Sequence, residues 1–113
     1  MENETKVLEE LNRKITQYEN EGDRNALKRI IAPKLAFMRA NGIIDDRSEF
    51  LLFVNDKGKP REITEMTSTI KNKTAVVSCK IIQDGKSYHN FRLFIKTENE
   101  WKLLGWANEE ELF

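Results

Sequence analysis

The chain has little of what metal binding, disulfide formation or phosphate binding requires. Its 113 residues include one cysteine, Cys79, and one histidine, His89. A lone cysteine forms no internal disulfide, and one cysteine with one histidine does not complete a structural zinc site. The acidic residues lack calcium-loop spacing, and the glycines are scattered singly rather than grouped in a phosphate-binding loop. We therefore expect no metal ion and no cofactor.

Net charge and long apolar runs are absent as well. Lysine plus arginine and aspartate plus glutamate number 19 each, so the formal net charge is zero. Non-specific phosphate binding needs a basic excess, which disfavours nucleic acid as a partner. No segment approaches the roughly 18 continuous apolar residues of a membrane span. The first residues, MENETKVLEELNRK, lack the apolar run of a signal peptide. We expect a cytoplasmic protein that binds neither nucleic acid nor a membrane.

Core material is nevertheless present. Six phenylalanines, two tryptophans and two tyrosines supply bulky apolar side chains that disordered chains lack. A chain of 113 residues suits one hydrophobic core but is short for two. We interpret residues 1–113 as one folded domain.

Helical signals lie in the first half. Apolar residues recur at three- and four-residue steps between positions 7 and 18, which predicts a helix over about residues 4–20. Gly22 ends this helix, and Asp23 caps a short second helix over about residues 24–31.

A short strand and a third helix follow. Residues 34–39 carry apolar side chains and end before an Asn-Gly turn signal, which predicts a brief strand. Asp46 followed by Glu49 matches a capping arrangement and predicts a helix over residues 47–55, although the LLFV run within it would also suit a strand.

The second half indicates strands only. Runs rich in β-branched and aromatic residues alternate with turn residues. The predicted strands form a meander over residues 62–71, 73–83, 86–97 and 101–108. Helices followed by an antiparallel sheet define the α+β class.

Alternation assigns side chains to the two faces of these strands. In residues 73–83, one side carries Ala75, Val77, Cys79 and Ile81. In residues 86–97, one face carries His89, Phe91, Leu93 and Ile95, and the other carries Tyr88, Asn90, Arg92 and Phe94. If the first of these two faces points into the pocket, His89 lies on the pocket wall, but alternation leaves open which face does so. Trp101 and Trp106 differ in parity and belong on opposite faces if no bulge intervenes.

The motifs have a characteristic order. They are Gly22-Asp23, Asn41-Gly42, Asp46-Arg47-Ser48-Glu49-Phe50, Lys73-Thr74-Ala75-Val76-Val77, the Gly85 turn and Trp101-Lys102-Leu103. In this order they resemble the nuclear transport factor 2-like (NTF2-like) superfamily, especially its SnoaL-like, ketosteroid-isomerase-like members. The resemblance implies a cystatin-like cone in which three N-terminal helices pack in the concave face of a strongly curved, mostly antiparallel sheet. It also implies a pocket for a small organic ligand and a homodimer formed through the outer sheet face.

The resemblance does not extend to steroid isomerisation. The positions that match the tyrosine and the two carboxylic acids of the steroid isomerases carry Ile15, Arg39 and Phe91. Proton abstraction next to a carbonyl needs a base, and the enolate needs a hydrogen-bond donor. No acidic residue lies between Arg24 and Ile44, so the base is missing.

His89 is the first catalytic candidate because its ordinary pKa suits proton transfer near neutrality. Scytalone-dehydratase-like members of the superfamily pair a histidine with an aspartate, which makes Asp45 or Asp46 the candidate partner. The alternatives are a surface histidine at a strand start and helix-capping aspartates.

Other candidates also have two interpretations. Arg39 and Arg92 can bind a ligand carboxylate or phosphate, or form cross-strand ion pairs. Tyr18 can reach a pocket with its hydroxyl or simply pack in the core. Cys79 is interpreted as a small buried hydrophobic residue rather than a nucleophile.

Three functions stay open. The first is a small-molecule-binding module, with a pocket lined by Tyr18, Phe37, Phe50, His89, Phe91, Arg92 and Trp101. The second is a lyase or isomerase that uses His89, with Tyr18 or Arg92 orienting the substrate. The third is a structural dimerisation domain whose interior is filled by Phe37, Phe50, Phe53 and Phe91.

Overall fold

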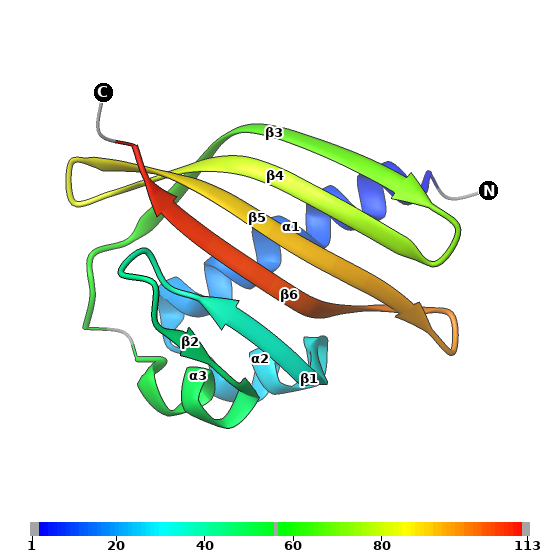
Figure 1. The fold of residues 1–113 in the computed structure, drawn as a ribbon, viewed down its shortest axis with the longest axis horizontal. Helices are drawn as coiled ribbons and strands as arrows, with labels where there is room; N and C mark the ends of the chain where they lie inside the picture. Colours follow the sequence, from blue (N-terminus) through cyan, green and yellow to red (C-terminus); the bar gives the residue numbers. More distant parts are fainter. Residues whose placement is uncertain (1–2, 56, 112–113) are drawn as a thin grey trace.

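One helical layer and one six-stranded sheet make up the molecule (Figure 1). The computed structural model describes residues 3–55 and 57–111. Its elements are α1 (Glu4–Glu21), α2 (Arg24–Ile30), β1 (Ile31–Met38), β2 (Ile44–Asp45), α3 (Arg47–Phe53), β3 (Arg61–Lys71), β4 (Thr74–Gln83), β5 (Lys86–Thr97) and β6 (Glu100–Glu110). The predicted α+β class is confirmed, and no helix in the described ranges is long and apolar enough to cross a membrane.

The three predicted helices are present, and polar caps set their ends. Gly22 closes α1 with a left-handed φ of 69°, a conformation that glycine adopts without a steric penalty. The Asp23 side chain accepts a hydrogen bond from the Ala26 backbone N–H, which starts α2. Asp46 and Glu49 form the predicted capping box at the start of α3.

The strand order in the sheet is β2-β1-β6-β5-β4-β3. The meander β3–β4–β5–β6 is antiparallel, as predicted, whereas β1 runs parallel to β6. Two features differ from the prediction. The short strand β2 was not expected, and β1 begins at Ile31, so Pro33 lies inside it, at a stretch where its register with β6 shifts.

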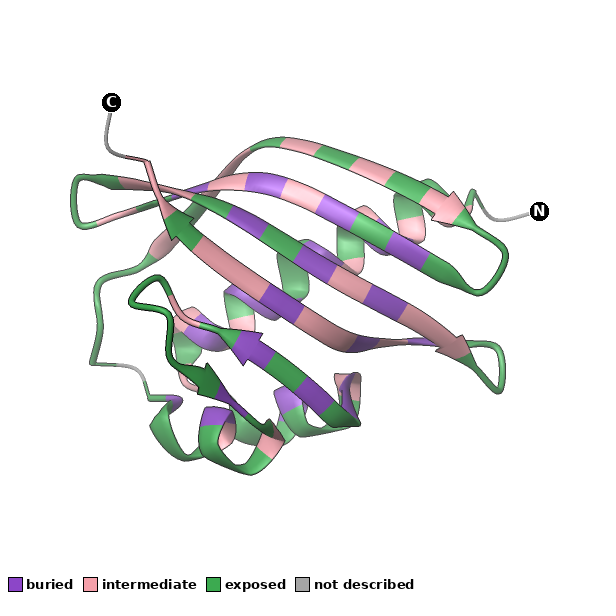
Figure 2. Cartoon of the chain, in the orientation of Figure 1, coloured by how far each residue is buried: buried purple, intermediate pink, exposed green. Residues whose placement is uncertain are grey.

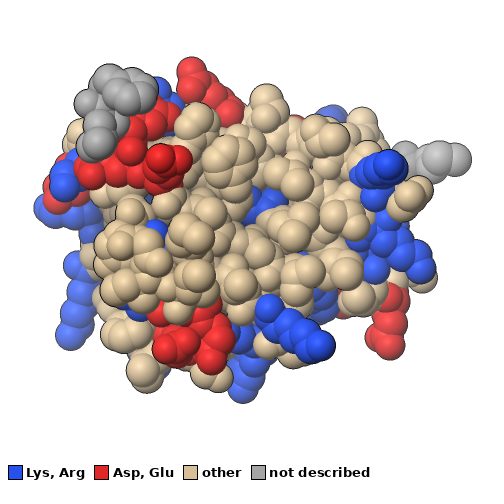
Figure 3. Space-filling view, viewed as in Figure 1, with Lys and Arg blue, Asp and Glu red and all other residues tan. Residues whose placement is uncertain are grey.

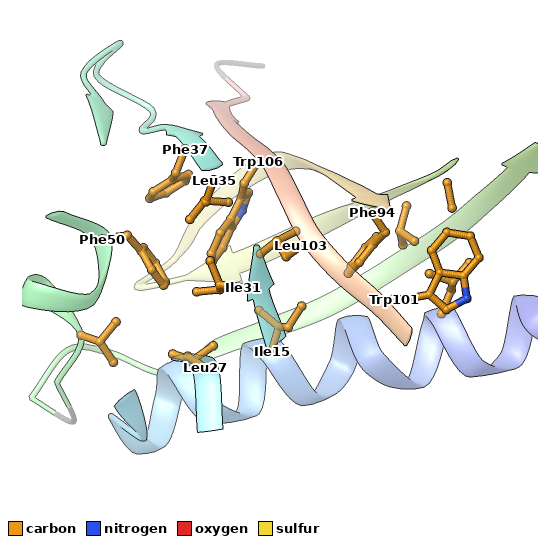
Figure 4. Packing of buried hydrophobic residues seen from close by; sticks show 14 residues of the cluster. Ile15, Leu27, Ile31, Leu35, Phe37, Phe50, Phe94, Trp101, Leu103 and Trp106 are labelled. Atoms are coloured by element: carbon orange, nitrogen blue, oxygen red, sulfur yellow. The ribbon is translucent and has the colours of Figure 1, made fainter. Parts of the chain in front are cut away.

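The core lies between α1 and the inner face of the sheet (Figure 4). Along β4, the predicted alternation is confirmed: Ala75, Val77, Cys79 and Ile81 are all buried (Figure 2). On α1, Leu8 and Ile15 are fully buried against this face. Figure 1 shows α1 crossing behind the sheet, while α2 and α3 lie beside β1.

The face of β5 that carries His89 and Phe91 points outward, so the condition under which His89 would line the pocket is not met. Arg92 and Phe94 are 1% and 0% exposed, whereas Phe91 is 44% exposed on the outer face. The two-residue period of a strand shows which residues share a face, but it does not show which face is buried. Here the buried face contains an arginine and an asparagine, Asn90, so the composition of the two faces does not identify the buried one.

A bulge in β6 also overturns the prediction that Trp101 and Trp106 lie on opposite faces. Both are buried in the same core cluster (Figure 4). Leu93 pairs with Gly105 and its neighbour Phe94 pairs with Leu103, so Leu104 is an extra residue that changes the parity. A Cβ atom at Gly105 would lie 3.3 Å from the Leu93 Cβ, a tight contact that the glycine beside the bulge avoids.

Truncating a core leucine should be far more costly than truncating an exposed one. Leu103 is fully buried, whereas Leu52 is 66% exposed on α3. We expect Leu103→Ala to lower the free energy of unfolding by about 2–5 kcal/mol because it leaves a cavity. Leu52→Ala, the matched control, should change it by less than about 0.5 kcal/mol. Urea denaturation measures both, and equal effects would contradict this packing.

Candidate functional site

Two adjoining cavities lie near the C-terminal end of α1, with volumes of about 280 and 180 Å³. They share a wall formed by Glu19, Arg61, Gln83 and Asn108. We call the larger one the outer cavity; it is also lined by Phe37, Arg39, Asp45, Phe50, Phe53 and Val54. We call the smaller one the inner cavity; it is also lined by Tyr88, Asn90, Arg92 and Trp106.

A row of polar residues on α1 faces the sheet, and its last member, Glu19, lines both cavities. Asn12, Thr16 and Glu19 follow one another at steps of four and three residues, so they lie on one face of the helix. All three are buried, with exposed fractions of 0%, 4% and 6%. This row shares its face with Ile15, so polar groups enter an otherwise apolar helix–sheet contact.

Arg92, from β5, binds the whole row. Its Nη1 donates hydrogen bonds to the Asn12 carbonyl oxygen at 3.0 Å and to the Thr16 Oγ1 at 3.1 Å, and its Nη2 donates to the Glu19 Oε1 at 3.0 Å. The guanidinium also lies over the Trp106 ring, with its Cζ 4.2 Å from the ring centroid. Trp106 is the residue opposite Arg92 on β6, so strand register creates this contact.

Burial acts on both charges of this pair. It raises the pKa of the Glu19 carboxyl, although the nearby Arg92 and Arg61 charges oppose the rise. It also lowers the pKa of the Arg92 guanidinium, which the Glu19 charge opposes. Each side chain therefore depends on the other to remain charged away from water.

Arg61 approaches the same carboxylate from β3. The Asn20 side chain fixes its backbone: the Nδ2 donates to the Arg61 carbonyl oxygen at 3.0 Å, and the Oδ1 accepts from the Arg61 N–H at 2.8 Å. The Arg61 Nε then lies 3.5 Å from the Glu19 Oε2, and the side chain is 31% exposed. Arg61 is thus part of the wall between the cavities and also reaches solvent.

Aromatic side chains and one ion pair line the outer cavity. The Phe37 and Trp106 ring centroids lie 4.5 Å apart, and the Phe37 and Phe50 centroids lie 5.6 Å apart. The Arg39 Nε donates to the Asp45 carboxylate at 2.5 Å, and the Arg39 Cζ lies 4.7 Å from the Phe53 ring centroid. Arg39 therefore forms an ion pair with Asp45 of β2, and it also lines the outer cavity.

The predicted pocket residues fall into three groups. Phe37, Phe50 and Arg92 line the two cavities. Tyr18 is half-buried against the core cluster, and Trp101 lines a separate groove between α1 and β6, so neither lines these cavities.

The other two predicted pocket residues, His89 and Phe91, lie on the outer face of the sheet. The His89 side chain is 52% exposed, stacks on Phe91 with a centroid separation of 5.4 Å, and lies 3.7 Å from the Glu111 carboxylate. Asp45 is paired with Arg39, and Asp46 caps α3, so neither of the two candidate aspartates is paired with His89. The geometric basis for a catalytic His89 inside the pocket is therefore wrong.

Cys79 is buried, as predicted. Its Sγ lies 3.7 Å from both the Asn12 amide nitrogen and the Asn90 amide oxygen, and burial raises the pKa of the thiol. A raised pKa keeps the thiol protonated, which is typical of an inert buried cysteine. Within residues 3–55 and 57–111, no cluster of three histidine, cysteine or acidic side chains forms a metal site.

None of the four residues of the shared wall was predicted: Glu19, Arg61, Gln83 and Asn108. For Glu19 a signal exists in the sequence, because it lies on the helical face that contains Leu8 and Ile15. A polar residue on an apolar helical stripe indicates a buried partner. Arg61, Gln83 and Asn108 have no such local signal, since only the tertiary fold brings β3, β4 and β6 to this end of α1.

Replacing Glu19 with glutamine should change how stability depends on pH. A carboxyl whose pKa is raised by folding binds more protons in the folded state than in the unfolded state, whose pKa is near 4.5. Its contribution to stability is therefore full below about pH 4.5 and is lost as the pH rises through the folded-state pKa. The free energy of unfolding of the wild type should fall relative to that of Glu19→Gln over this window. Urea denaturation from pH 4 upward tests this, and a pH-independent difference would contradict it.

Comparisons with known proteins find only structural likeness. No family model matches the sequence, and no curated protein matches it either. A solved NTF2-like protein from Cytophaga hutchinsonii superposes with a TM-score of 0.87 at 14% identity, covering 97% of this chain and 100% of that one.

Two kinase-associated domains are similar as well. The CaMKII hub of S. rosetta has a TM-score of 0.85 at 15% identity, covering 98% of this chain and 99% of that one. A putative Ca/calmodulin-dependent kinase II association domain from Exiguobacterium sibiricum has a TM-score of 0.78 at 18% identity, covering 98% and 97%. At such identities the likeness concerns the fold, and it confirms the resemblance drawn from the motifs: the chain has the NTF2-like fold.

Proposed function

We propose that this chain is a domain that binds a small organic molecule in the outer and inner cavities. The observation that carries the proposal is the pair of adjoining cavities with an aromatic wall on one side and a shared polar wall on the other. Ligand sites typically combine apolar surface with a few placed polar groups. Phe37, Phe50 and Phe53 border the outer cavity without filling it, which favours binding over a purely structural interior.

Binding is favoured over catalysis because the ionisable groups of the cavities are already engaged. Glu19 contacts Arg92 and Arg61, and Asp45 is paired with Arg39. A general base needs a free lone pair within reach of the substrate proton. His89, the residue best suited to proton transfer, lies on the opposite face of the sheet.

A fragment screen followed by two-dimensional ¹H–¹⁵N NMR tests the proposal. Fragments that bind should shift the backbone signals of wall residues, with Glu19, Gln83 and Asn108 as the diagnostic set. The signals of Val76 and Phe91 on the outer face serve as the internal control and should not move. Shifts confined to the outer face, or no binding by any fragment, would contradict the proposal.

We also propose that two copies pair through the outer face of the sheet. Its exposed apolar side chains include Met38 (44%), Ile44 (60%), Val76 (41%) and Phe91 (44%), which we call the outer patch. They border a shallow groove of about 360 Å³ with almost entirely apolar walls. In Figure 3 the centre of this face is almost uncharged and the charged side chains lie around it. An apolar centre with a charged rim is typical of a protein interface, and the similar Exiguobacterium protein is a putative association domain.

A charge in the outer patch should break this pairing. We expect the wild type to elute as a dimer with twice the 13.3 kDa chain mass, and Val76→Glu to elute as a folded monomer, because pairing would bury the new carboxylate without a partner. Leu52→Glu, on exposed α3, is the control and should remain dimeric. Size-exclusion chromatography with light scattering measures the mass, and a monomeric wild type would overturn the proposal.

A further inference from the structure

We propose that the ligand is a small monocarboxylic acid with an apolar or aromatic body, and that Arg61 binds its carboxylate. This inference rests on the proposed binding function and adds the chemical class of the ligand. Arg61 belongs to the wall shared by the two cavities, so a group bound to it can extend into either.

The charges around the cavities favour an anion. Among residues 3–55 and 57–111, the charged side chains that line them are three arginines, Arg39, Arg61 and Arg92, and two carboxylates, Glu19 and Asp45. One positive charge is therefore in excess among these described residues, in a partly desolvated site where an unpaired charge is costly. A monoanion such as a carboxylate balances this excess, whereas a doubly charged phosphate would exceed it.

Of the three arginines, Arg61 has the most donors to offer. The terminal nitrogens of Arg92 are bound to α1, and the Arg39 Nε is bound to Asp45. The terminal nitrogens of Arg39 and Arg61 both donate no hydrogen bond to any residue of the ranges 3–55 and 57–111, but the Arg39 guanidinium lies over the Phe53 ring. The Arg61 Nε lies 3.5 Å from the Glu19 carboxylate without a hydrogen bond in those ranges, so all of its N–H groups stay available. Two terminal N–H groups on one guanidinium match the two oxygens of a carboxylate.

The inner cavity supplies a second, independent indication. The Nε of Arg92 and the indole Nε1 of Trp106 are buried without a hydrogen-bond partner in the described ranges, and both residues line this cavity. Buried donors normally have an acceptor, because an unmade hydrogen bond in the interior costs stability. The oxygens of a carboxylate are acceptors of the kind that these donors lack, whereas a hydrocarbon has none.

The outer cavity accounts for the apolar body. Phe37, Phe50, Phe53 and Val54 form its wall, beside Arg61. Its volume of about 280 Å³ is just below the range of roughly 300–1,000 Å³ that is usual for ligand sites, which indicates a small molecule. A single ring on a short chain that ends in a carboxylate has this size and this distribution of polarity.

Calorimetric titration with a matched pair of probes tests the inference. We would titrate 3-phenylpropanoate and its neutral analogue 3-phenylpropanamide into the wild type, Arg61→Gln and Arg13→Gln. Arg13 is exposed on α1 and lines neither cavity, so Arg13→Gln is the charge-matched control. We expect the wild type and Arg13→Gln to bind the carboxylate at least about tenfold more tightly than the amide. Arg61→Gln should lose this preference while keeping its thermal unfolding transition, since the side chain is partly exposed.

The possible results distinguish failure of the carboxylate inference from failure of the proposed small-molecule binding. Equal binding of the acid and the amide by the wild type would overturn the carboxylate assignment and leave a small-molecule-binding domain in place. A preference for the acid that survives in Arg61→Gln would overturn the role of Arg61. Binding of neither probe would overturn this ligand class, whereas the NMR fragment screen separately decides whether the cavities bind small molecules.

Discussion

Arg92 brings a positive charge into the space between the sheet and α1, and the rest of the interior is arranged around that charge. Removing a guanidinium from water is affordable only where several acceptors replace the lost hydration. Here the acceptors come from Asn12, Thr16 and Glu19 on one helix and an aromatic face comes from Trp106 on the neighbouring strand. Loss of either member of such a buried pair typically destabilises a protein by about 3–5 kcal/mol, so the pair fixes how α1 sits on the sheet.

The cavities follow from the same constraint. A helix row that contains Asn12, Thr16 and Glu19 cannot interlock with the sheet as leucines would, because each polar group must keep its partner. Glu19 is also the point where Arg61 of β3 meets α1, and Asn20 holds that strand in place through two backbone hydrogen bonds. The polar contacts that stabilise the helix–sheet contact therefore also form the wall that a ligand would meet.

Local patterns explain how much was predictable. Helix ends were predicted because caps act within a few residues, as Asp46 and Glu49 do, and the meander was predicted because turns and alternation are local as well. Which face of β5 points inward was not predicted. Arg92 and Asn90 are residue types usually exposed to solvent, and only the tertiary fold places their partners, Glu19 and Asn108, beside them. The bulge at Leu104 was not predicted either, because it is defined by the register between β6 and β5, which pairs residues distant in the sequence.

The inward direction of the Arg92 side chain determines what lies on the outer face of β5. Because side chains alternate, burying Asn90, Arg92 and Phe94 places Phe91 and its apolar neighbours on the outside. β5 therefore contributes a polar group to the interior and an apolar group to the surface, the reverse of an ordinary half-buried strand. Such a strand is stable only when hydrogen-bond and ion-pair partners surround the charge in the interior and another surface buries the apolar side chains on the outside. The polar wall of the inner cavity and the outer patch thus both follow from the orientation of β5. This is why the proposed binding site and the proposed pairing surface lie on opposite faces of the same sheet.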